Sequence, residues 1–289
     1  MKPGAIGIVL HPRRDSADMV ECIVRWAEGH GKAVRTLEEA GDLVPSSVTP
    51  VPEGELAVGA GLIIGLGGDG TILRALKLAT EARIPVLGVN LGRLAFLAEV
   101  NLDELPDALD RIDRDEHWIE ERAVMTVTGT CFAGRLRAFN DSALSRVPGH
   151  GPAALAVEVE DEVFARYTAD ALVIATPTGS TAYSFAAGGP IVSPRHRGLL
   201  VTPVAPHAAF DRAVFLHPDE RLRVHVLERS APLLLEADGQ RVDELQAGDC
   251  IEFGLAERPA QILRLHSQGF YERARRKLQL TDSSELAPR

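Results

Sequence analysis

The 289-residue sequence is short of three things: cysteine, positive charge and long apolar runs. Its three cysteines, Cys22, Cys131 and Cys250, are scattered and form no C-x-x-C pair, so we expect buried thiols rather than a disulfide framework or a zinc site. Lys and Arg number 31 against 41 Asp and Glu, a net charge of −10, which argues against a nucleic-acid binder and an anionic membrane surface. No apolar run approaches the ~20 residues of a membrane span, and no signal pattern precedes the first apolar segment. We therefore expect a cytoplasmic protein that binds neither nucleic acid nor membrane.

The first 122 residues alternate strand and helix patterns. The expected elements are strands at 5–10, 32–37, 61–66 and 84–89, and helices at 16–30, 71–81 and 102–113, with a proline-rich loop at 41–54. This order predicts an α/β domain with a parallel sheet and helices on its faces.

The pattern of apolar and polar residues changes at about residue 123. Nine short runs separated by Gly, Pro or Asp predict an all-β second domain, most simply a sandwich, over 123–267. Residues 270–280 return to a helical pattern and the last seven form a loose end, so 268–289 is expected to be a C-terminal helix and tail packing back on the first domain. The basic residues Arg273, Arg275, Arg276 and Lys277 are expected to complement the C-terminus of that helix.

A glycine-rich turn in 62–71, LIIGLGGDGT, connects an expected strand to an expected helix. Gly65, Gly67 and Gly70 match G-x-G-x-x-G, but a dinucleotide-binding Rossmann turn also needs an acid about 20 residues further on, and none occurs before Glu99. No Gly-Lys-Ser/Thr follows, so the turn is not a Walker A loop. Asp69 would repel bare phosphate, and it makes sense as a base for a hydroxyl or as a neighbour of a metal ion. An ordinary structural turn remains the alternative.

A second segment, 176–183, reads TPTGSTAY and is followed by Gly188-Gly189-Pro190. Its hydroxyls and open backbone suit nucleotide recognition, although a polar turn would look similar. Asn140-Asp141 offers an amide beside a carboxylate, Asp238-Gly239-Gln240 is typical of a hairpin turn, and Arg74 in the first turn of the expected helix could meet phosphate. His207 is expected to be structural.

In their residues and in their order along the chain, these motifs resemble those of the NAD kinase family. The resemblance covers residues 5 to about 280 and is carried by GGDGT (67–71), NLGRLAFL (90–97), FND (139–141), TPTGSTAY (176–183), GGPI (188–191), VTPVAPH (201–207), DGQ (238–240) and the tail FYERARRKL. It implies a Rossmann-like N-terminal domain, a β-sandwich C-terminal domain and NAD between them. It also implies phosphorylation of the 2′-hydroxyl of the adenosine ribose of NAD, with ATP or polyphosphate as donor, Mg²⁺ as cofactor, and a homodimer or homotetramer.

The resemblance makes Asp69 the general base, with Gly70 as its loop partner, and places Gly68 and Gly70 among the residues that bind NAD or ATP. No metal ligand follows from it. The residues that it implies for NAD or ATP are Arg74 at phosphate, Phe96 at adenine, Asn140 and Asp141 at sugar and amide groups, Asp170 at the nicotinamide side, and Thr168, Thr178, Thr181, Ala182, Tyr183, Ser184, Ala186, Ala205 and Gln240 around the dinucleotide.

The sequence departs from the family pattern at several positions. Asp141 stands where Glu is usual and reaches about one methylene less far, and Ala171, Ala186, Asp211 and Ala213 replace other common residues. Thr168 is neutral where some members carry a basic residue, which we expect to relax discrimination between NAD and NADH.

Three alternatives remain at this point. A lipid or sphingoid-base kinase shares the GGDGT turn but does not need TPTGSTAY. A noncatalytic NAD-sensing module could keep the pocket without turnover, although Asp69 disfavours it. A Rossmann dehydrogenase is weakened by the missing acid.

Overall fold

The computed structural model describes residues 4–92, 95–266 and 269–280. The chain divides into two units, each with its own core. The first comprises Met1–Glu121 and Ala260–Arg289, and the second comprises Arg122–Pro259.

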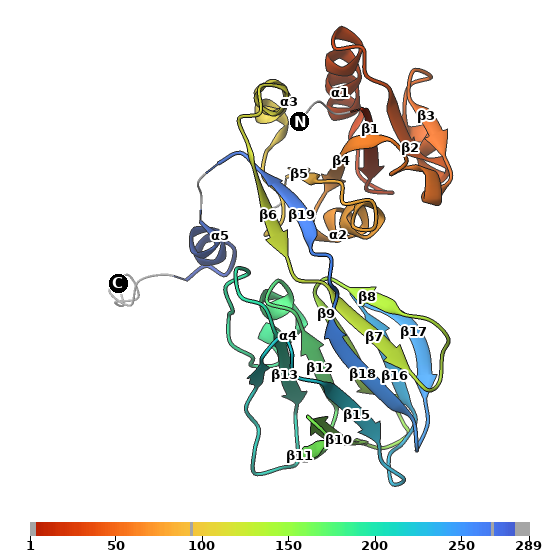
Figure 1. Cartoon of the computed structure of the whole chain (residues 1–289), viewed down its shortest axis with the longest axis vertical. Helices are drawn as coiled ribbons and strands as arrows, with labels where there is room; N and C mark the ends of the chain where they lie inside the picture. The colour runs from red at the N-terminus through yellow and green to blue at the C-terminus, as the bar shows by residue number, and fades with distance from the viewer. Residues whose placement is uncertain (1–3, 93–94, 267–268, 281–289) are drawn as a thin grey trace. The chain divides into compact units, whose positions relative to one another are not determined.

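The first unit is built on a seven-stranded sheet in the order β3-β2-β1-β4-β5-β19-β6 (Figure 1). Strand pairs from β3 to β19 run parallel, as the alternation of strand and helix predicts. The strands are β1 Ala5–Leu10, β2 Val34–Leu37, β3 Thr49–Val51, β4 Ala60–Gly67, β5 Val86–Asn90, β6 Trp118–Arg122 and β19 Ala260–Arg264.

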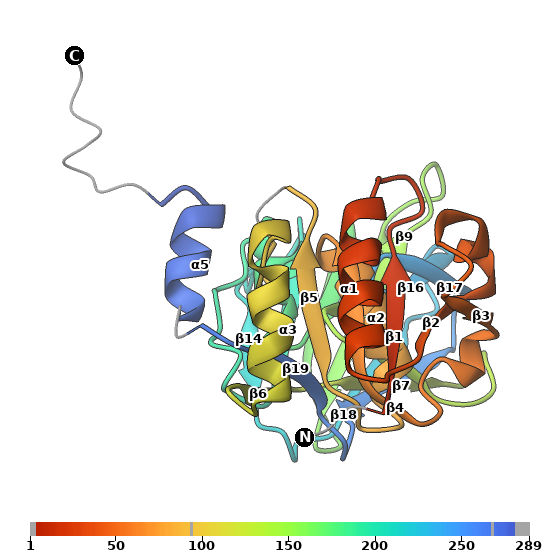
Figure 2. The same cartoon turned by 90° about the horizontal axis from the view of Figure 1, so that it is seen from above.

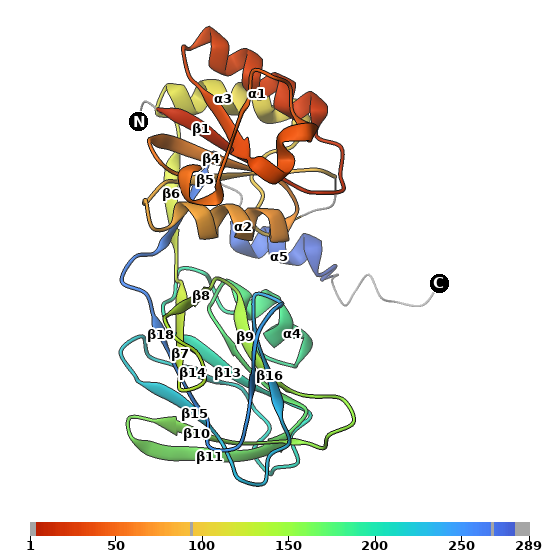
Figure 3. The ribbon, with the colours of Figure 1, turned by 90° about the vertical axis from the view of Figure 1, so that its right-hand side faces the viewer.

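Helices cover both faces of this sheet. α1 and α3 lie side by side on one face and α2 on the other (Figures 2 and 3). α1 buries Met19, Val20, Ile23, Val24 and Ala27, the stripe that its sequence period predicts. The α-helices are α1 Ala17–Gly29, α2 Asp69–Ala79, α3 Leu105–Asp113 and α5 Phe270–Lys277, and the short 3-10 helices are η1 Glu38–Leu43, η2 Glu53–Glu55 and η3 Leu102–Glu104.

Two sequence expectations fail in this unit. Residues 41–54 are not all loop, because β3 pairs with β2 and tolerates Pro50 at the edge of the sheet. The second domain does not extend to residue 267, because β19 pairs with β5 and places Leu263 in the core of the first unit. The predicted helix at 270–280 is confirmed as α5, and the expected loose end lies outside the described residues.

The second unit is a sandwich of two six-stranded sheets, ordered β11-β10-β15-β18-β7-β8 and β14-β13-β12-β9-β16-β17. Residues from both sheets, among them Leu155 and Leu172, form one buried cluster, so the predicted all-β sandwich is confirmed. The strands are β7 Met125–Gly129, β8 Leu136–Ala138, β9 Asp141–Arg146, β10 Ala153–Val159, β11 Glu162–Ala169, β12 Ala171–Ala175, β13 Leu199–Val204, β14 Val214–Leu216, β15 Leu222–Val226, β16 Leu233–Ala237, β17 Gln240–Leu245 and β18 Cys250–Leu255.

Each of the nine predicted runs contains one of these strands. β9, β14 and β17 were not expected, because β9 and β17 begin on polar residues and β14 has only three residues. Two helical pieces interrupt the strands, the 3-10 helix η4 Gly179–Thr181 and the short helix α4 Tyr183–Ala186.

The three cysteines are free thiols and are half-buried rather than fully buried. Burial raises the pKa of each thiol, and neighbouring acids such as Asp249 add to the effect at Cys131. Among the described residues, no helix combines the length and the apolar character needed to cross a membrane.

Candidate functional site

The glycine-rich turn joins the end of β4 to the start of α2. Gly67 is required by close packing, since a Cβ there would lie 2.2 Å from Thr71 Oγ1. A Cβ on Gly68 or Gly70 would instead meet nothing within 4 Å. The backbone at these two glycines therefore faces open space at a helix N-terminus, where N–H groups and the helix dipole favour an anion.

Asp69 is the first residue of α2, and its carboxylate is held at both oxygens. Oδ1 accepts a hydrogen bond from the backbone N–H of Leu97 at 2.9 Å. Oδ2 forms an ion pair with Nζ of Lys277, which comes from the last turn of α5. The Asp69 side chain is 27% exposed, so part of the carboxylate remains open to solvent.

The role expected for the basic residues of α5 is therefore incomplete. Arg275, Arg276 and Lys277 do lie in its last turn, where they suit the helix dipole. Lys277 also pairs with Asp69, and Arg273 pairs with Glu99 at 3.6 Å. These two partners lie far away in the sequence, and only the i, i+4 spacing of Arg273 and Lys277 hinted at a shared face.

Phe96 and Arg74 lie in the same unit as Asp69. Phe96 is half-buried, and Lys277 Nζ lies 4.3 Å from the centroid of its ring. Arg74 pairs with Glu39, and its Nη2 lies 3.8 Å from Glu53 Oε2. The hydrogen bond from Arg74 lowers the pKa of Glu39.

In the second unit, Asp238 organises the Asn140-Asp141 pair. Its Oδ1 accepts hydrogen bonds from the backbone N–H of Asn140 at 2.7 Å and of Phe139 at 3.1 Å. Asp238 and Gly239 both have positive φ, 48° and 73°, and form the two-residue turn between β16 and β17. The hairpin predicted from Asp-Gly is thereby confirmed, while the carboxylate's second task was missed because its partners lie about 100 residues away.

Asp141 is a buried carboxylate, 7% exposed, at the start of β9. Burial, and secondarily the charge of Asp238, raise its pKa from 3.8 to about 6, while a hydrogen bond from the backbone of Tyr183 acts in the opposite direction. Within the Asn140-Asp141 pair, Asp141 is therefore the side chain that changes its charge close to neutral pH.

Two hydroxyls of the TPTGSTAY segment, those of Thr176 and Ser180, face inward, as does that of the next residue, Ser184. Thr176 donates to Phe139 O at 2.6 Å, Ser180 donates to Pro177 O at 2.7 Å, and Ser184 lies 2.8 Å from Thr202 Oγ1. All three side chains are fully buried, so they fix the segment rather than offer donors to a ligand. The Ser184 hydroxyl is therefore not available to a ligand in this geometry, whereas Thr178, Thr181, Ala182 and Tyr183 keep accessible surface.

Gly179 explains why the segment needs its glycine. A Cβ there would lie 2.0 Å from the carbonyl oxygen of Asn140, which accepts a hydrogen bond from Thr176 N at 2.9 Å. The segment and the Asn140-Asp141 pair are therefore in direct backbone contact.

The remaining predicted residues of the second unit are half-buried or exposed. Thr168 lies in β11, and its carbonyl accepts the N–H of His207 at 2.7 Å. Asp170 pairs with Arg146 at 2.5 Å. The others that keep accessible surface are Thr178, Thr181, Ala182, Tyr183, Ala186, Ala205 with its positive φ of 47°, and Gln240.

The donor set for Mg²⁺ is sparse. Among the described residues, no three side chains of His, Cys, Asp or Glu gather closely enough to hold a metal ion. Mg²⁺ commonly uses one or two carboxylates together with substrate phosphates, and a lone Asp69 beside open backbone fits that kind of site.

Comparison with known proteins places both halves of the chain in one family. The family model described as the ATP-NAD kinase N-terminal domain matches residues 6–117, and that of the ATP-NAD kinase C-terminal domain matches residues 139–265. NAD kinase 1 of Streptomyces avermitilis is 36% identical, over 96% of this chain and 88% of the relative. NAD kinase of Rhodococcus erythropolis is 35% identical, over 94% and 93%.

Solved structures share the fold. Yeast NADH kinase complexed with NADH superposes with a TM-score of 0.84 at 24% identity, over 98% of this chain and 89% of that chain. An NAD kinase from Archaeoglobus fulgidus in complex with ATP gives a TM-score of 0.73 at 23% identity, over 96% and 100%.

Proposed function

Since the chain belongs to the NAD kinase family, we propose that it transfers the γ-phosphoryl group of ATP to the 2′-hydroxyl of the adenosine ribose of NAD, giving NADP. Matches to both domain models and to relatives over most of the chain favour this activity over a lipid kinase, a dehydrogenase or a noncatalytic NAD sensor.

The observation that carries the mechanism is the setting of Asp69. A ribose hydroxyl has a pKa far above 7, so a positioned base helps as its oxygen attacks phosphorus. The Leu97 N–H fixes one oxygen of the Asp69 carboxylate at 2.9 Å, and the side chain remains partly exposed. In our proposal this carboxylate accepts the proton of the 2′-hydroxyl.

We propose that the open backbone at Gly68 and Gly70 contacts phosphate oxygens. Mg²⁺ bound to the ATP phosphates would neutralise their charge, with Asp69 as the nearest protein carboxylate in the turn. Arg74 is also proposed to face phosphate, which requires that it leave Glu39 and Glu53; all three side chains are at least 36% exposed, so the surface ion pairs that hold it are weak.

NAD recognition is assigned to the second unit. Asn140 and Asp141, fixed by Asp238, are proposed to bind sugar and amide groups of NAD, and Asp170 the nicotinamide side. The accessible residues Thr178, Thr181, Ala182, Tyr183, Ala186, Ala205 and Gln240 complete the set, while Phe96 of the first unit serves the adenine side. We further propose a homodimer or homotetramer in the cytoplasm.

The proposal on the choice between NAD and NADH as substrate rests on Thr168. It is neutral and half-buried, so it provides no charge to distinguish the nicotinamide ring of NAD from that of NADH. We therefore expect comparable initial rates on NAD and NADH at equal concentrations. A strict preference for NAD would contradict this.

The test is an assay for NADP formation from NAD, ATP and Mg²⁺, with polyphosphate and diacylglycerol as alternative donor and acceptor. Asp69→Asn should keep the fold and lower kcat by at least about 10²-fold, because general-base catalysis contributes about 10²–10⁴-fold. Asp42→Asn, at an exposed acid of the same unit, is the matched control. Near-wild-type kcat in folded Asp69→Asn would overturn the base assignment, and NAD binding without ATP consumption would overturn the kinase activity.

A further inference from the structure

The C-terminal helix α5 places two cations, four residues apart, on two carboxylates of the first unit. Arg273 pairs with Glu99, and Lys277 pairs with Asp69. Residues at i and i+4 share one face of a helix, so a single face of α5 makes both contacts. One of those contacts reaches Asp69, the proposed general base.

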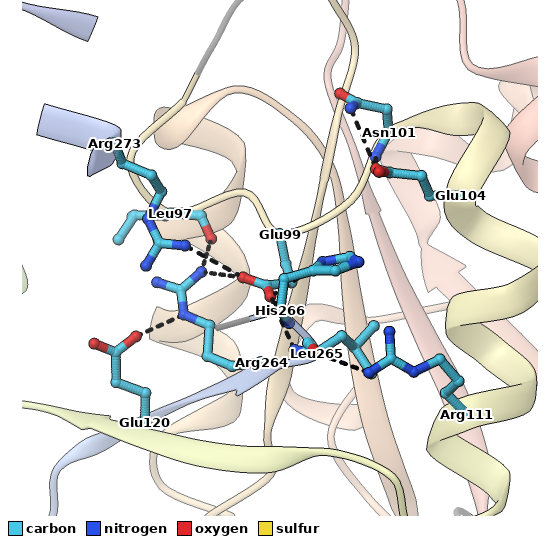
Figure 4. Close-up of polar contacts among 10 residues, drawn as sticks. All are labelled: Leu97, Glu99, Asn101, Glu104, Arg111, Glu120, Arg264, Leu265, His266 and Arg273. Carbon is cyan, nitrogen blue, oxygen red and sulfur yellow. Dashed lines mark hydrogen bonds and ion pairs between the residues drawn. The ribbon is translucent and has the colours of Figure 1, made fainter. Parts of the chain in front are cut away.

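The Arg273 contact anchors α5 to a buried network around Glu99 (Figure 4). The Glu99 side chain is 1% exposed, and its Oε2 accepts a hydrogen bond from Arg264 Nη1 at 2.9 Å. Its Oε1 accepts the backbone N–H groups of Leu265 at 2.8 Å and His266 at 2.7 Å. A charge held by so many partners in the interior is rigid, which gives α5 a fixed attachment point.

The same network reaches Asp69 by a second route. Arg264 Nη1 donates to the carbonyl of Leu97 at 3.1 Å, and Leu97 N–H donates to Asp69 Oδ1 at 2.9 Å. One residue, Leu97, thus links the buried arginine to the carboxylate. The loop that holds Oδ1 and the helix that holds Oδ2 are both tied to Glu99.

Lys277 is itself restrained at two points. Its Nζ pairs with Asp69 Oδ2 and lies 4.3 Å from the centroid of the Phe96 ring, a distance at which the aromatic face attracts a cation. Phe96 in turn lies 6.5 Å from the Phe270 ring at the start of α5. The ammonium group therefore has a defined place beside the carboxylate.

We propose that Lys277 is a positioning residue for the kinase reaction: it holds Oδ2 of Asp69 from α5 while Leu97 N–H holds Oδ1, which fixes the plane of the carboxylate toward the ribose hydroxyl. This inference rests on the proposed role of Asp69 as base. A base that can rotate is misplaced for part of the time, and a displacement of about 1 Å can lower a rate by about 10²-fold.

The experiment compares Lys277→Met and Lys277→Gln with the wild type and with Lys77→Met, an exposed lysine of α2. We expect both Lys277 variants to lose at least about 10-fold in kcat, with the KM for NAD changed by no more than about twofold, because orientation rather than binding is lost. Lys77→Met should match the wild type. The thermal unfolding midpoint is measured for every variant.

A double variant separates this inference from the base assignment. Adding Lys277→Met to Asp69→Asn should cause no further loss of kcat, since the two residues act as a unit. Wild-type kcat in Lys277→Met, or a rise in KM with kcat retained, would overturn the inference and leave the base assignment intact. A further loss in the double variant would also overturn it, because Lys277 would then act apart from Asp69. Wild-type kcat in Asp69→Asn would instead remove the base assignment itself.

Discussion

The Oδ1 atom of Asp238 accepts a hydrogen bond from the backbone N–H of Asn140 at 2.7 Å, across about 100 residues of sequence. This bond ties the turn between β16 and β17 to the start of β9. It makes the hairpin turn a support for the proposed NAD-binding pair rather than an independent surface feature.

Replacing Asp238 tests that support. Asp238→Ala leaves the N–H groups of Phe139 and Asn140 without their acceptor, so we expect a loss of about 1–3 kcal/mol in unfolding free energy and a higher KM for NAD. Asp238→Asn keeps one acceptor oxygen and should lose less. Thermal unfolding and steady-state kinetics measure both effects, with Asp211→Ala at an exposed acid as control. An unchanged KM and midpoint would show that the pair is held without Asp238.

Gly179→Ala should be among the most disruptive single-methyl changes in the second unit. The added Cβ would lie 2.0 Å from Asn140 O, and the hydrogen bond from Thr176 N to that oxygen would have to break. We expect a loss of at least about 2 kcal/mol, because overpacking and a lost buried hydrogen bond combine. Gly254→Ala is the control, since its Cβ would meet Thr126 Oγ1 at an ordinary 3.4 Å. Equal unfolding midpoints for the two variants would contradict the argument.

Asp141 should make the stability of the second unit depend on pH. Its pKa is raised to about 6 in the folded state, above the ordinary 3.8, so the folded state binds more protons between these values. Unfolding free energy should therefore fall as pH rises from about 4 to about 6, by at most about 3 kcal/mol. Asp141→Asn should be more stable than the wild type at pH 7.5, and the difference should shrink near pH 4. Unfolding midpoints at the two pH values test this, and Asp219→Asn, at a side chain that is 89% exposed, should show no such pH-dependent difference from the wild type.

The buried pair of Arg264 and Glu99 predicts a large effect from a single substitution. Both side chains are 1% exposed, and Arg264→Met would leave the charge of Glu99 with fewer partners in the interior. We expect a loss of about 3–5 kcal/mol, whereas Arg276→Met, which breaks an exposed pair with Glu272, should cost about 0.5 kcal/mol or less. Denaturant unfolding distinguishes the two, and similar values would mean that the buried pair adds little.

The sequence by itself determined the class of both units. The apolar stripe from Met19 to Ala27 and the nine short β runs are local patterns. Such patterns can be recognised in a sequence without knowing which elements they pack against. The motifs likewise identified the family, because each is a contiguous stretch of sequence; TPTGSTAY distinguishes it from the lipid kinases that share the GGDGT turn.

Only the tertiary structure decided which sheet β19 joins, because a short apolar strand pairs equally well in either unit and its place depends on β5. The same holds for the partners of the charged residues. Asp238 meets Asn140, and Lys277 meets Asp69, over separations of 98 and 208 residues. Hydrogen bonds and ion pairs act over a few ångströms in space, so a sequence shows which groups are available but not which of them the fold brings within that range.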